Sequence, residues 1–248
     1  MKTDTIVYGL RAVIEAVQAE KPINKVFIQK GISGDLSREL EYLLRKKKTS
    51  TSYVPVERLN KLTTNNHQGA VALISPINFK NFDDLIEDIL QNVETPLFLL
   101  LDQVTDVRNF GAIIRTAECT GVNAIIIPKT GSAPINSDTI KTSSGAAFNV
   151  PIAKVDHLKD AIYYLQASGI KIVAATEKGS DTIYDIDLNK GSAIIMGAED
   201  KGISNSLLQL ADHSAKLPIA GKIGSLNVSV ACGVFLYEVL RQRLENTH

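Results

Sequence analysis

The stretch LFLLLDQVTDVRNFGAIIRTA, residues 97–117, decides the fold class of this chain. Its first five residues are all apolar, a pattern typical of a strand that is buried on both faces of a parallel sheet. The polar turn that follows leads into a helical pattern in which Phe110, Ile114 and Ala117 recur on one face. A strand that runs through a short turn into a helix is the repeating unit of an α/β domain.

The same alternation continues toward the carboxyl terminus. Helical patterns separate further short apolar runs, so we expect a parallel sheet with helices packed on it. The final helix, about Val228 to Arg243, is apolar on nearly all sides, which is typical of a helix covered by more than one surface. The expected strands are Leu97–Leu101, Ala124–Ile127, Lys171–Ala175, Ala193–Met196 and Ala215–Leu217.

The residues before Pro96 form a separate region. Residues 77–95 are acidic, contain one amphipathic helical pattern and lie between two prolines, which indicates a connecting segment. The sequence therefore predicts an amino-terminal α/β domain over 1–76, a linker over 77–95 and a catalytic domain over 96–248. The elements expected in the first domain are strands at Lys25–Gln29, Tyr53–Val56 and Ala70–Ile74 and a helix from Asp35 to Lys48.

The bulk composition excludes several classes of protein. The 248 residues include 27 Lys and Arg and 27 Asp and Glu, so any surface for nucleic acid must be local. The run Arg45–Lys48 is one candidate, and the solvated end of a helix is its alternative interpretation. Two cysteines and four histidines without a ligand spacing predict no metal site. We expect a cytoplasmic protein without a membrane partner, because the sequence lacks an apolar signal core and any membrane-spanning run.

Three polar segments follow expected strands, at the edge where open α/β sheets bind ligands. The first lies within 101–117, the second is IIMGAEDKGI at 194–203, and the third is LPIAGKIGSLNVS at 217–229. Backbone groups of such loops can hold an adenine edge or a carboxylate without charged side chains. Neither a dinucleotide-binding glycine fingerprint nor a P-loop occurs, which argues against a dehydrogenase and a P-loop enzyme.

In order and spacing, the three segments resemble the motifs of the SpoU (TrmH) class of the SPOUT methyltransferases, over residues 95–245. The opening YGLRAV at 8–13 and the first domain resemble the RlmB subgroup, in which a small ribosomal-protein-like RNA-binding domain precedes the catalytic domain. One departure is Val107, where the family often has a proline; it affects loop stiffness and no chemical group. The resemblance implies S-adenosylmethionine as methyl donor, a homodimer that buries the last helix, and a deep trefoil knot in the carboxyl-terminal domain.

The resemblance also implies roles for single residues. Arg115 would position a phosphate or stabilise the developing alkoxide, because a guanidinium acts as a base only in a strongly perturbed site. Asn109 would orient Arg115 or the ribose, and Glu199 would bind the substrate or anchor Arg115. Ser225 and Asn227 would order the pocket at the start of the last helix. The residues expected around S-adenosylmethionine are Thr176, Gly197, Leu217, Ile219 and Leu226.

Each of these residues also has a simpler structural interpretation. Asn227 could serve only as a helix N-cap, Arg115 only as a surface residue, and Glu199 only as a loop carboxylate. Ser143–Ala147 resembles a family segment that lines the site, with tight packing as an equal alternative. Three motifs that occur together favour the functional interpretation over the structural one.

The expected function is 2'-O-methylation of a guanosine ribose in 23S ribosomal RNA. DNA is excluded as a substrate because it lacks the 2'-hydroxyl. One alternative is a transfer-RNA 2'-O-methyltransferase, although the separate first domain suits docking on a structured ribosomal fragment. The other is a non-catalytic RNA-binding factor in ribosome assembly, which the intact Asn109, Arg115, Glu199 and Asn227 disfavour.

Overall fold

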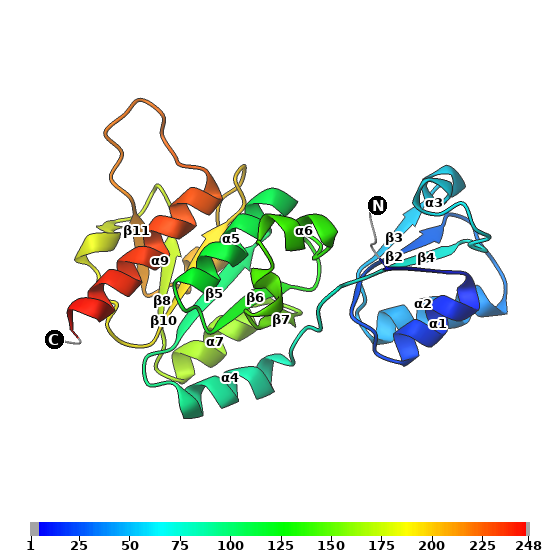
Figure 1. Ribbon diagram of the computed structural model, residues 1–248, viewed down its shortest axis with the longest axis horizontal. Helices are drawn as coiled ribbons and strands as arrows, with labels where there is room; N and C mark the ends of the chain where they lie inside the picture. Colours follow the sequence, from blue (N-terminus) through cyan, green and yellow to red (C-terminus); the bar gives the residue numbers. More distant parts are fainter. Residues whose placement is uncertain (1–4, 247–248) are drawn as a thin grey trace. The chain divides into compact units, whose positions relative to one another are not determined.

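The computed structural model describes residues 5–246, which fold into two compact units. The chain up to Asn78 and the short segment Pro134–Ser137 belong to the first unit. Phe79–Ala133 and the chain from Asp138 onward belong to the second. Figure 1 draws the first unit in blue and cyan, and most of the second in green to red.

The first unit is a four-stranded sheet with helices on both faces (Figure 1). Its elements are β1 Thr5–Tyr8, α1 Leu10–Gln18, β2 Ile23–Gln29, α2 Asp35–Lys46, β3 Thr51–Val54, α3 Val56–Leu62 and β4 Ala70–Ile74. The strand order is β1-β4-β2-β3, and only β2 and β3 run parallel. On β2, Val26 and Ile28 are buried in a cluster with α1 and α2. Because side chains alternate along a strand, Lys25 and Phe27 point to the opposite face.

The second unit is built on a seven-stranded sheet in which every pairing is parallel. Its strands are β5 Leu97–Asp102, β6 Ala124–Pro128, β7 Ile152–Val155, β8 Lys171–Ala175, β9 Asp181–Thr182, β10 Ser192–Gly197 and β11 His213–Lys216. Their order is β7-β6-β5-β10-β8-β11-β9. The central pair, β5 and β10, is buried along its whole length. The parallel α/β fold expected from the apolar runs is confirmed.

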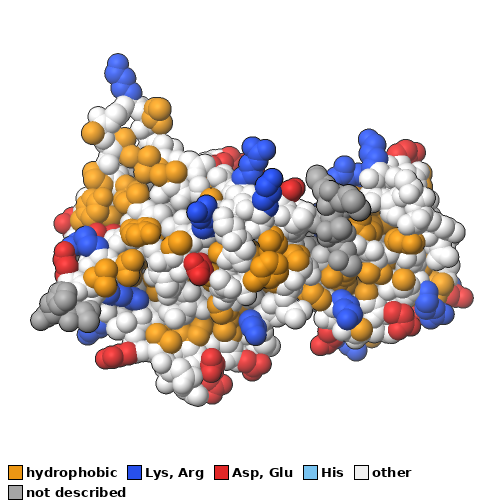
Figure 2. Space-filling model, viewed as in Figure 1, with side chains coloured by type: hydrophobic (Ala, Val, Ile, Leu, Met, Phe, Trp, Pro, Cys, Tyr) orange, Lys and Arg blue, Asp and Glu red, His pale blue; other side chains and the backbone are white. Residues whose placement is uncertain are grey.

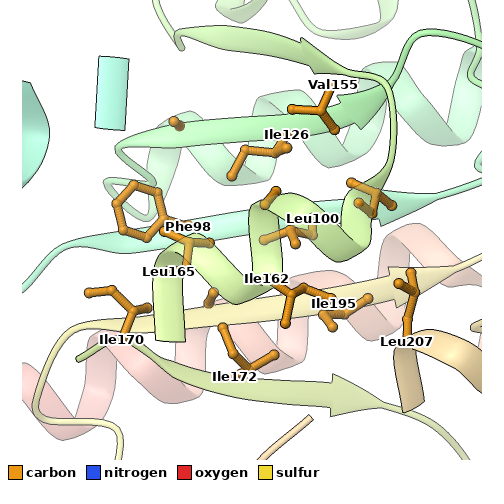
Figure 3. Packing of buried hydrophobic residues seen from close by; sticks show 14 of the residues in the cluster. Phe98, Leu100, Ile126, Val155, Ile162, Leu165, Ile170, Ile172, Ile195 and Leu207 are labelled. Carbon is orange, nitrogen blue, oxygen red and sulfur yellow. The ribbon is translucent and has the colours of Figure 1, made fainter. Parts of the chain in front are cut away.

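Helices cover the two faces of this sheet (Figure 1). On one face, α4 Phe82–Asn92 and α7 Leu158–Ala167 pack over a cluster that includes Phe98, Leu100 and Ile126 (Figure 3). On the other, α5 Val107–Cys119 lies against α9 Val228–Glu245. The remaining helical segments are α6 Ser137–Thr142, η1 Ala146–Phe148, η2 Ile183–Asp185 and α8 Asn205–Leu208. Among residues 5–246, no helix combines the length and the apolar character needed to cross a bilayer.

The parallel sheet places all three polar segments at one edge. The carboxyl ends of β5, β10 and β11 lie on the same side of the sheet, and β5 and β10 are direct neighbours in which Asp102 is paired with Gly197. α5 begins shortly after β5, and α9 begins after the loop that follows β11. The amino-terminal ends of both helices therefore reach the edge at which the β10 loop emerges.

Several expected boundaries were wrong, because strands β2, β3 and β11 each begin two residues earlier than expected and other elements end elsewhere. Val56 begins α3 instead of ending a strand, because Pro55 precedes it as the N-cap residue. The second helix ends at Lys46, two residues before the expected Lys48. Leu217 lies beyond the end of β11, in the loop that leads to α9.

Candidate active site

A pocket of about 570 Å³ lies at the carboxyl ends of β8, β10 and β11. This volume falls in the range of small-molecule binding sites. Its walls are residues that follow β8, the loop that follows β10, and the loop between β11 and α9. All five residues predicted to surround the methyl donor line it: Thr176, Gly197, Leu217, Ile219 and Leu226.

A hydrogen-bonded cluster of side chains borders this pocket. Oε1 of Glu199 accepts a hydrogen bond from Nδ2 of Asn109 at 2.8 Å and one from Nδ2 of Asn227 at 2.6 Å. The amide nitrogen of Asn227 also donates to Oδ1 of Asn109 at 3.1 Å. Glu199 and Asn227 line the pocket directly. The cluster thus joins one residue from each of the three polar segments.

The start of α9 fixes the orientation of the Asn227 amide. Oδ1 of Asn227 caps the helix by accepting from the backbone N–H of Ser229 at 2.9 Å and of Val230 at 3.4 Å. The Ser229 hydroxyl also donates to this oxygen, at 2.6 Å. Since the oxygen faces the helix, the amide nitrogen faces Glu199. The N-cap role and the site role of Asn227 are therefore compatible.

The start of α5 positions Asn109 in a similar way. Asp106 is the N-cap residue, and its Oδ1 accepts from the backbone N–H of Arg108 at 2.9 Å and of Asn109 at 2.8 Å. Asn109 therefore sits in the first turn of α5, and its side chain reaches Glu199. The amino-terminal ends of two helices, each with a partial positive charge, thus lie beside one carboxylate.

Arg115 is separate from this cluster. Its side chain is exposed on α5 and forms no hydrogen bond or ion pair with any residue in the part of the chain that the structure describes. It does not line the pocket. Within one chain, Asn109 and Glu199 bind each other and not Arg115. The expectation that these two residues orient or anchor Arg115 is therefore not met within a single chain.

The loop between β11 and α9 is the least supported wall of the pocket. Residues 217–226 form no hydrogen bond with any described residue, and the loop is exposed from Ile219 to Asn227. Ile223 is 80% exposed. Ser225 lines the pocket from this loop, as expected for the third segment. The position of Ser225 is therefore set by the two ends of the loop and by whatever the pocket binds.

The loop after β10, in contrast, is held in one conformation by close backbone contacts. A Cβ atom added at Gly197 would lie 2.1 Å from the backbone carbon of Gly202 and 2.2 Å from the backbone nitrogen of Ile203. Gly202 donates its N–H to the carbonyl of Ala198 at 2.8 Å and has a φ of +66°. The loop folds back on itself so tightly that only glycine fits at position 197.

Two further groups of residues lie outside the pocket. Ser143–Ala147 does not line it; η1 packs against α5 instead, and a Cβ at Gly111 of α5 would lie 2.6 Å from Cβ of Thr142. This contact favours the tight-packing interpretation. Ser229 belongs to the cluster and was missed, since its only signal in the sequence was a hydroxyl two positions after Asn227. Residues 5–246 contain no group of His, Cys, Asp and Glu that could hold a metal ion.

Comparisons with known proteins define the class. Residues 96–237 match the model of the SpoU rRNA Methylase family, and residues 6–80 match that of RNA 2'-O ribose methyltransferase substrate binding. The chain is 37% identical over 98% of its length to the 23S rRNA (guanosine-2'-O-)-methyltransferase RlmB of Vibrio cholerae, 99% of which is covered. It is 36% identical over 97% of its length to a putative TrmH family tRNA/rRNA methyltransferase of Staphylococcus aureus, of which 97% is covered.

Solved structures agree. The SpoU methyltransferase AviRb of Streptomyces viridochromogenes, in complex with the cofactor AdoMet, has a TM-score of 0.62 at 25% identity, over 97% of this chain and 90% of that one. An AdoMet-bound rRNA methyltransferase of Sinorhizobium meliloti has a TM-score of 0.61 at 26% identity, over 95% and 86%. The chain therefore belongs to the SpoU rRNA methylase family. Within that family it is an RNA 2'-O-ribose methyltransferase that carries a substrate-binding unit ahead of the methylase domain.

Proposed function

We propose that this protein methylates the 2'-hydroxyl of a guanosine ribose in 23S ribosomal RNA, with S-adenosylmethionine as methyl donor. The observation that carries the proposal is the pocket at the sheet edge, bordered by the cluster of Asn109, Glu199 and Asn227. The full-length similarity to the RlmB protein of Vibrio cholerae supports the choice of nucleoside and RNA. A ribosomal RNA substrate implies a cytoplasmic location.

The pocket suits S-adenosylmethionine in size and in the chemistry of its walls. Leu217, Ile219 and Leu226 offer apolar surface for an adenine ring, while Thr176 and the backbone of Gly197 offer polar groups. When bound, the donor supplies a methyl group that is already activated for transfer. The remaining task of the protein is to align the ribose oxygen and to accept its proton, and alignment alone can contribute roughly 7–11 kcal/mol.

Glu199 is the group in the pocket best placed to meet the ribose. Both amides bind its Oε1, and Oε2 forms no hydrogen bond with another residue in the 5–246 range. This second oxygen is available to accept a hydrogen bond from the 2'-hydroxyl. Asn109 and Asn227 then act as positioning residues, because they hold the carboxylate in one orientation.

We also propose a homodimer, formed through a groove between α5 and α9. The groove, about 770 Å³ in volume, is walled mainly by small and apolar side chains, and Val230 and Tyr237 are each 53% exposed beside it. Ala112 lines it from α5, and Arg115 follows three residues later, on the same side of the helix. A second copy of the chain bound in the groove would cover these apolar groups, and Arg115 would then lie at the interface between the two subunits.

An uneven distribution of charge supports the proposed role of residues 1–76 as an RNA-binding domain, although the net charge of the whole chain is zero. Residues 1–78 contain 12 Lys and Arg against 7 Asp and Glu, whereas the other 170 residues contain 15 against 20. An excess of positive charge on one unit is what contact with phosphates requires. The substrate-binding family match over residues 6–80 covers the same unit.

Mapping of 2'-O-methyl groups in cells with and without the gene tests the proposal. We expect one guanosine of 23S ribosomal RNA to lose its methyl group in the deletion strain and to regain it when the wild-type gene, but not a Glu199→Ala variant, is restored. Loss of a methyl group from transfer RNA alone would favour the alternative substrate. An unchanged methylation pattern would favour the non-catalytic assembly factor.

A further inference from the structure

The charged side chains of the first unit are paired to different extents on its two sides, and this difference bears on where RNA binds. On the side of α1 and α2, three cations have acidic partners, whereas Arg11 and Lys46 form no ion pair with a described residue. Arg38 pairs with Asp35 at 2.5 Å, Arg45 of the basic run approaches Glu41 at 3.9 Å, and Lys47 of the same run pairs with Glu20. The run Arg45–Lys48 is thus partly neutralised within its own unit and ends a helix whose dipole also favours cations.

The opposite side of the sheet has a different balance. α3 packs on β2 and β4 there, through Leu59, which is fully buried and lies outside the cluster formed with α1 and α2. Arg58 and Lys61 are exposed on α3, Lys25 points to the same face of β2, and Lys30 directly follows that strand. None of these four forms an ion pair with any described residue. Glu57 is the only acidic residue between Glu41 and Asp83.

Aromatic rings accompany these cations. Val71 of β4 is paired with Tyr8 of β1 on one side and with Phe27 of β2 on the other, so the three side chains form a row across this face. Tyr8 is 38% exposed, and Nζ of Lys25 lies 5.5 Å from the centre of the Phe27 ring. Cations beside exposed rings suit unpaired nucleotides, whose phosphates need positive charge and whose bases stack on aromatic groups.

Figure 2 shows basic side chains at the top of the first unit, where Figure 1 places α3, with an acidic group beside them; basic and acidic groups are also mixed below, around α1 and α2. Building on the RNA-binding role proposed above, we propose that an unpaired segment of the substrate RNA docks on the α3 face. Lys25, Lys30, Arg58 and Lys61 contact its phosphates, and Tyr8 and Phe27 stack on its bases. The run Arg45–Lys48 stays in solvent.

Two double variants with the same change in charge test this assignment in the full-length protein. Arg58→Gln/Lys61→Gln removes two cations from the α3 face, and the control Lys46→Gln/Lys47→Gln removes two from the basic run. Binding of an in vitro transcript of 23S ribosomal RNA is measured over a range of salt concentrations. Each lost phosphate contact lowers the slope of log K against log salt by about 0.7–0.9, so we expect the α3 variant to lower it by about 1.5 and the control to leave it unchanged.

A third variant separates stacking from charge. Tyr8→Leu should weaken binding roughly 5–100-fold, the effect of losing one stacked base, and leave the salt slope unchanged. Thermal unfolding of each variant, and its titration with S-adenosylmethionine, show whether the fold and the second unit are intact.

A control variant that weakens RNA binding as much as the α3 variant would overturn the assignment of the docking surface to the α3 face. If the wild type binds and methylates the transcript while α3 variants bind normally, the docking surface is wrong and the proposed function stands. If the wild type neither binds nor methylates it, both fail.

Discussion

Asn227 performs two tasks with the two ends of one amide group. Its oxygen caps α9, and its nitrogen binds Glu199 and Asn109. An N-cap asparagine contributes typically about 1 kcal/mol to stability, so a substitution that removes the whole side chain changes folding and the site together. The two tasks can be separated only by a replacement that keeps the oxygen and loses the nitrogen.

Asn227→Asp is that replacement. Aspartate caps helices as well as asparagine does, but it cannot donate to Glu199 and places a second negative charge within about 3 Å of it, as judged from the 2.6 Å hydrogen bond. We expect methyl transfer to fall at least 100-fold, with little change in the unfolding midpoint. Asn227→Ala, the comparison variant, should lose activity and about 1 kcal/mol of stability. Substantial methyl transfer by Asn227→Asp would show that the amide nitrogen has no role in the site.

Gly197→Ala should abolish binding of the methyl donor by changing the backbone conformation of the loop that follows β10. The new methyl group would overlap the backbone of Gly202 and Ile203, so the loop that carries Glu199 must move. We expect calorimetry to show loss of S-adenosylmethionine binding, together with a destabilisation of about 1–3 kcal/mol from overpacking. Gly221→Ala is the matched control, because a Cβ at Gly221 meets no atom within 4 Å. Normal binding by Gly197→Ala would mean that the loop conformation does not matter for the donor.

At this scale, the sequence selected residues that lie close together in the fold. Asn109, Glu199 and Asn227 were selected through three motifs, and the structure brings them within hydrogen-bonding distance although they come from distant parts of the chain. The partners of each side chain were not predictable. Ser229 was missed because its hydroxyl matters only through the orientation of Asn227. Arg115 lies apart because contacts made in one chain need not include those made in an assembly.

At the scale of secondary structure, the long apolar strands were the easiest elements to predict. β5, β8 and β10 agree with the expected ranges to within one residue at each end. The elements missed in the first unit, β1, α1 and α3, have four to nine residues, so little periodicity was available in them. β7 was missed as well, because the short sequence IAKV contains a lysine that alternation alone would place in solvent.

That lysine makes β7 sensitive to pH. Nζ of Lys154 lies 3.7 Å from the centre of the Phe79 ring, and burial lowers its pKa to about 8. In the unfolded chain, lysine has a pKa of about 10.4. The unfolded state therefore binds more protons between these values, and this group makes the free energy of unfolding rise with pH from about 8 to about 10.4.

Lys154→Met should abolish this dependence. The methionine side chain fills a similar volume and needs no hydration, so we expect the variant to be more stable than the wild type at pH 7 and to lose the gain in stability above pH 8. Urea unfolding at several pH values measures both effects. A wild type whose free energy of unfolding does not rise in that interval would show that Lys154 keeps its ordinary pKa in the folded protein.

At the scale of the whole molecule, the apolar character of α9 was predicted correctly, but the direction in which each of its residues points was not predictable. Leu236 is fully buried in the core of its own chain. Val230 and Tyr237 are exposed apolar residues beside the groove. The amount of apolar surface on a helix can be read from sequence, but which part faces the core depends on the exact rotation of the helix. The trefoil knot stays a prediction.

Complementation between inactive subunits tests whether the proposed dimer completes the site. Because Arg115 lies outside the pocket of its own chain, we expect it to serve the pocket of the partner. Arg115→Ala and Glu199→Ala homodimers should both be inactive, whereas a mixed dimer, purified through two different tags, should regain one of its two sites. An inactive mixed dimer would place Arg115 and Glu199 in the same subunit's site, and a monomeric wild type in sedimentation experiments would refute the dimer itself.

The unsupported loop between β11 and α9 makes the liganded state visible to a protease. Lys222 lies in the exposed stretch, next to Ile223, and residues 217–226 form no hydrogen bond with any other described residue. Trypsin should therefore cut the free protein first after Lys222. A ligand at about 100 times its Kd stabilises the bound state by about 2.7 kcal/mol, so cleavage that requires the loop to leave the pocket should slow roughly 100-fold when S-adenosylmethionine is present. The survival of one peptide bond would then report how much of the enzyme in a cell extract carries its methyl donor.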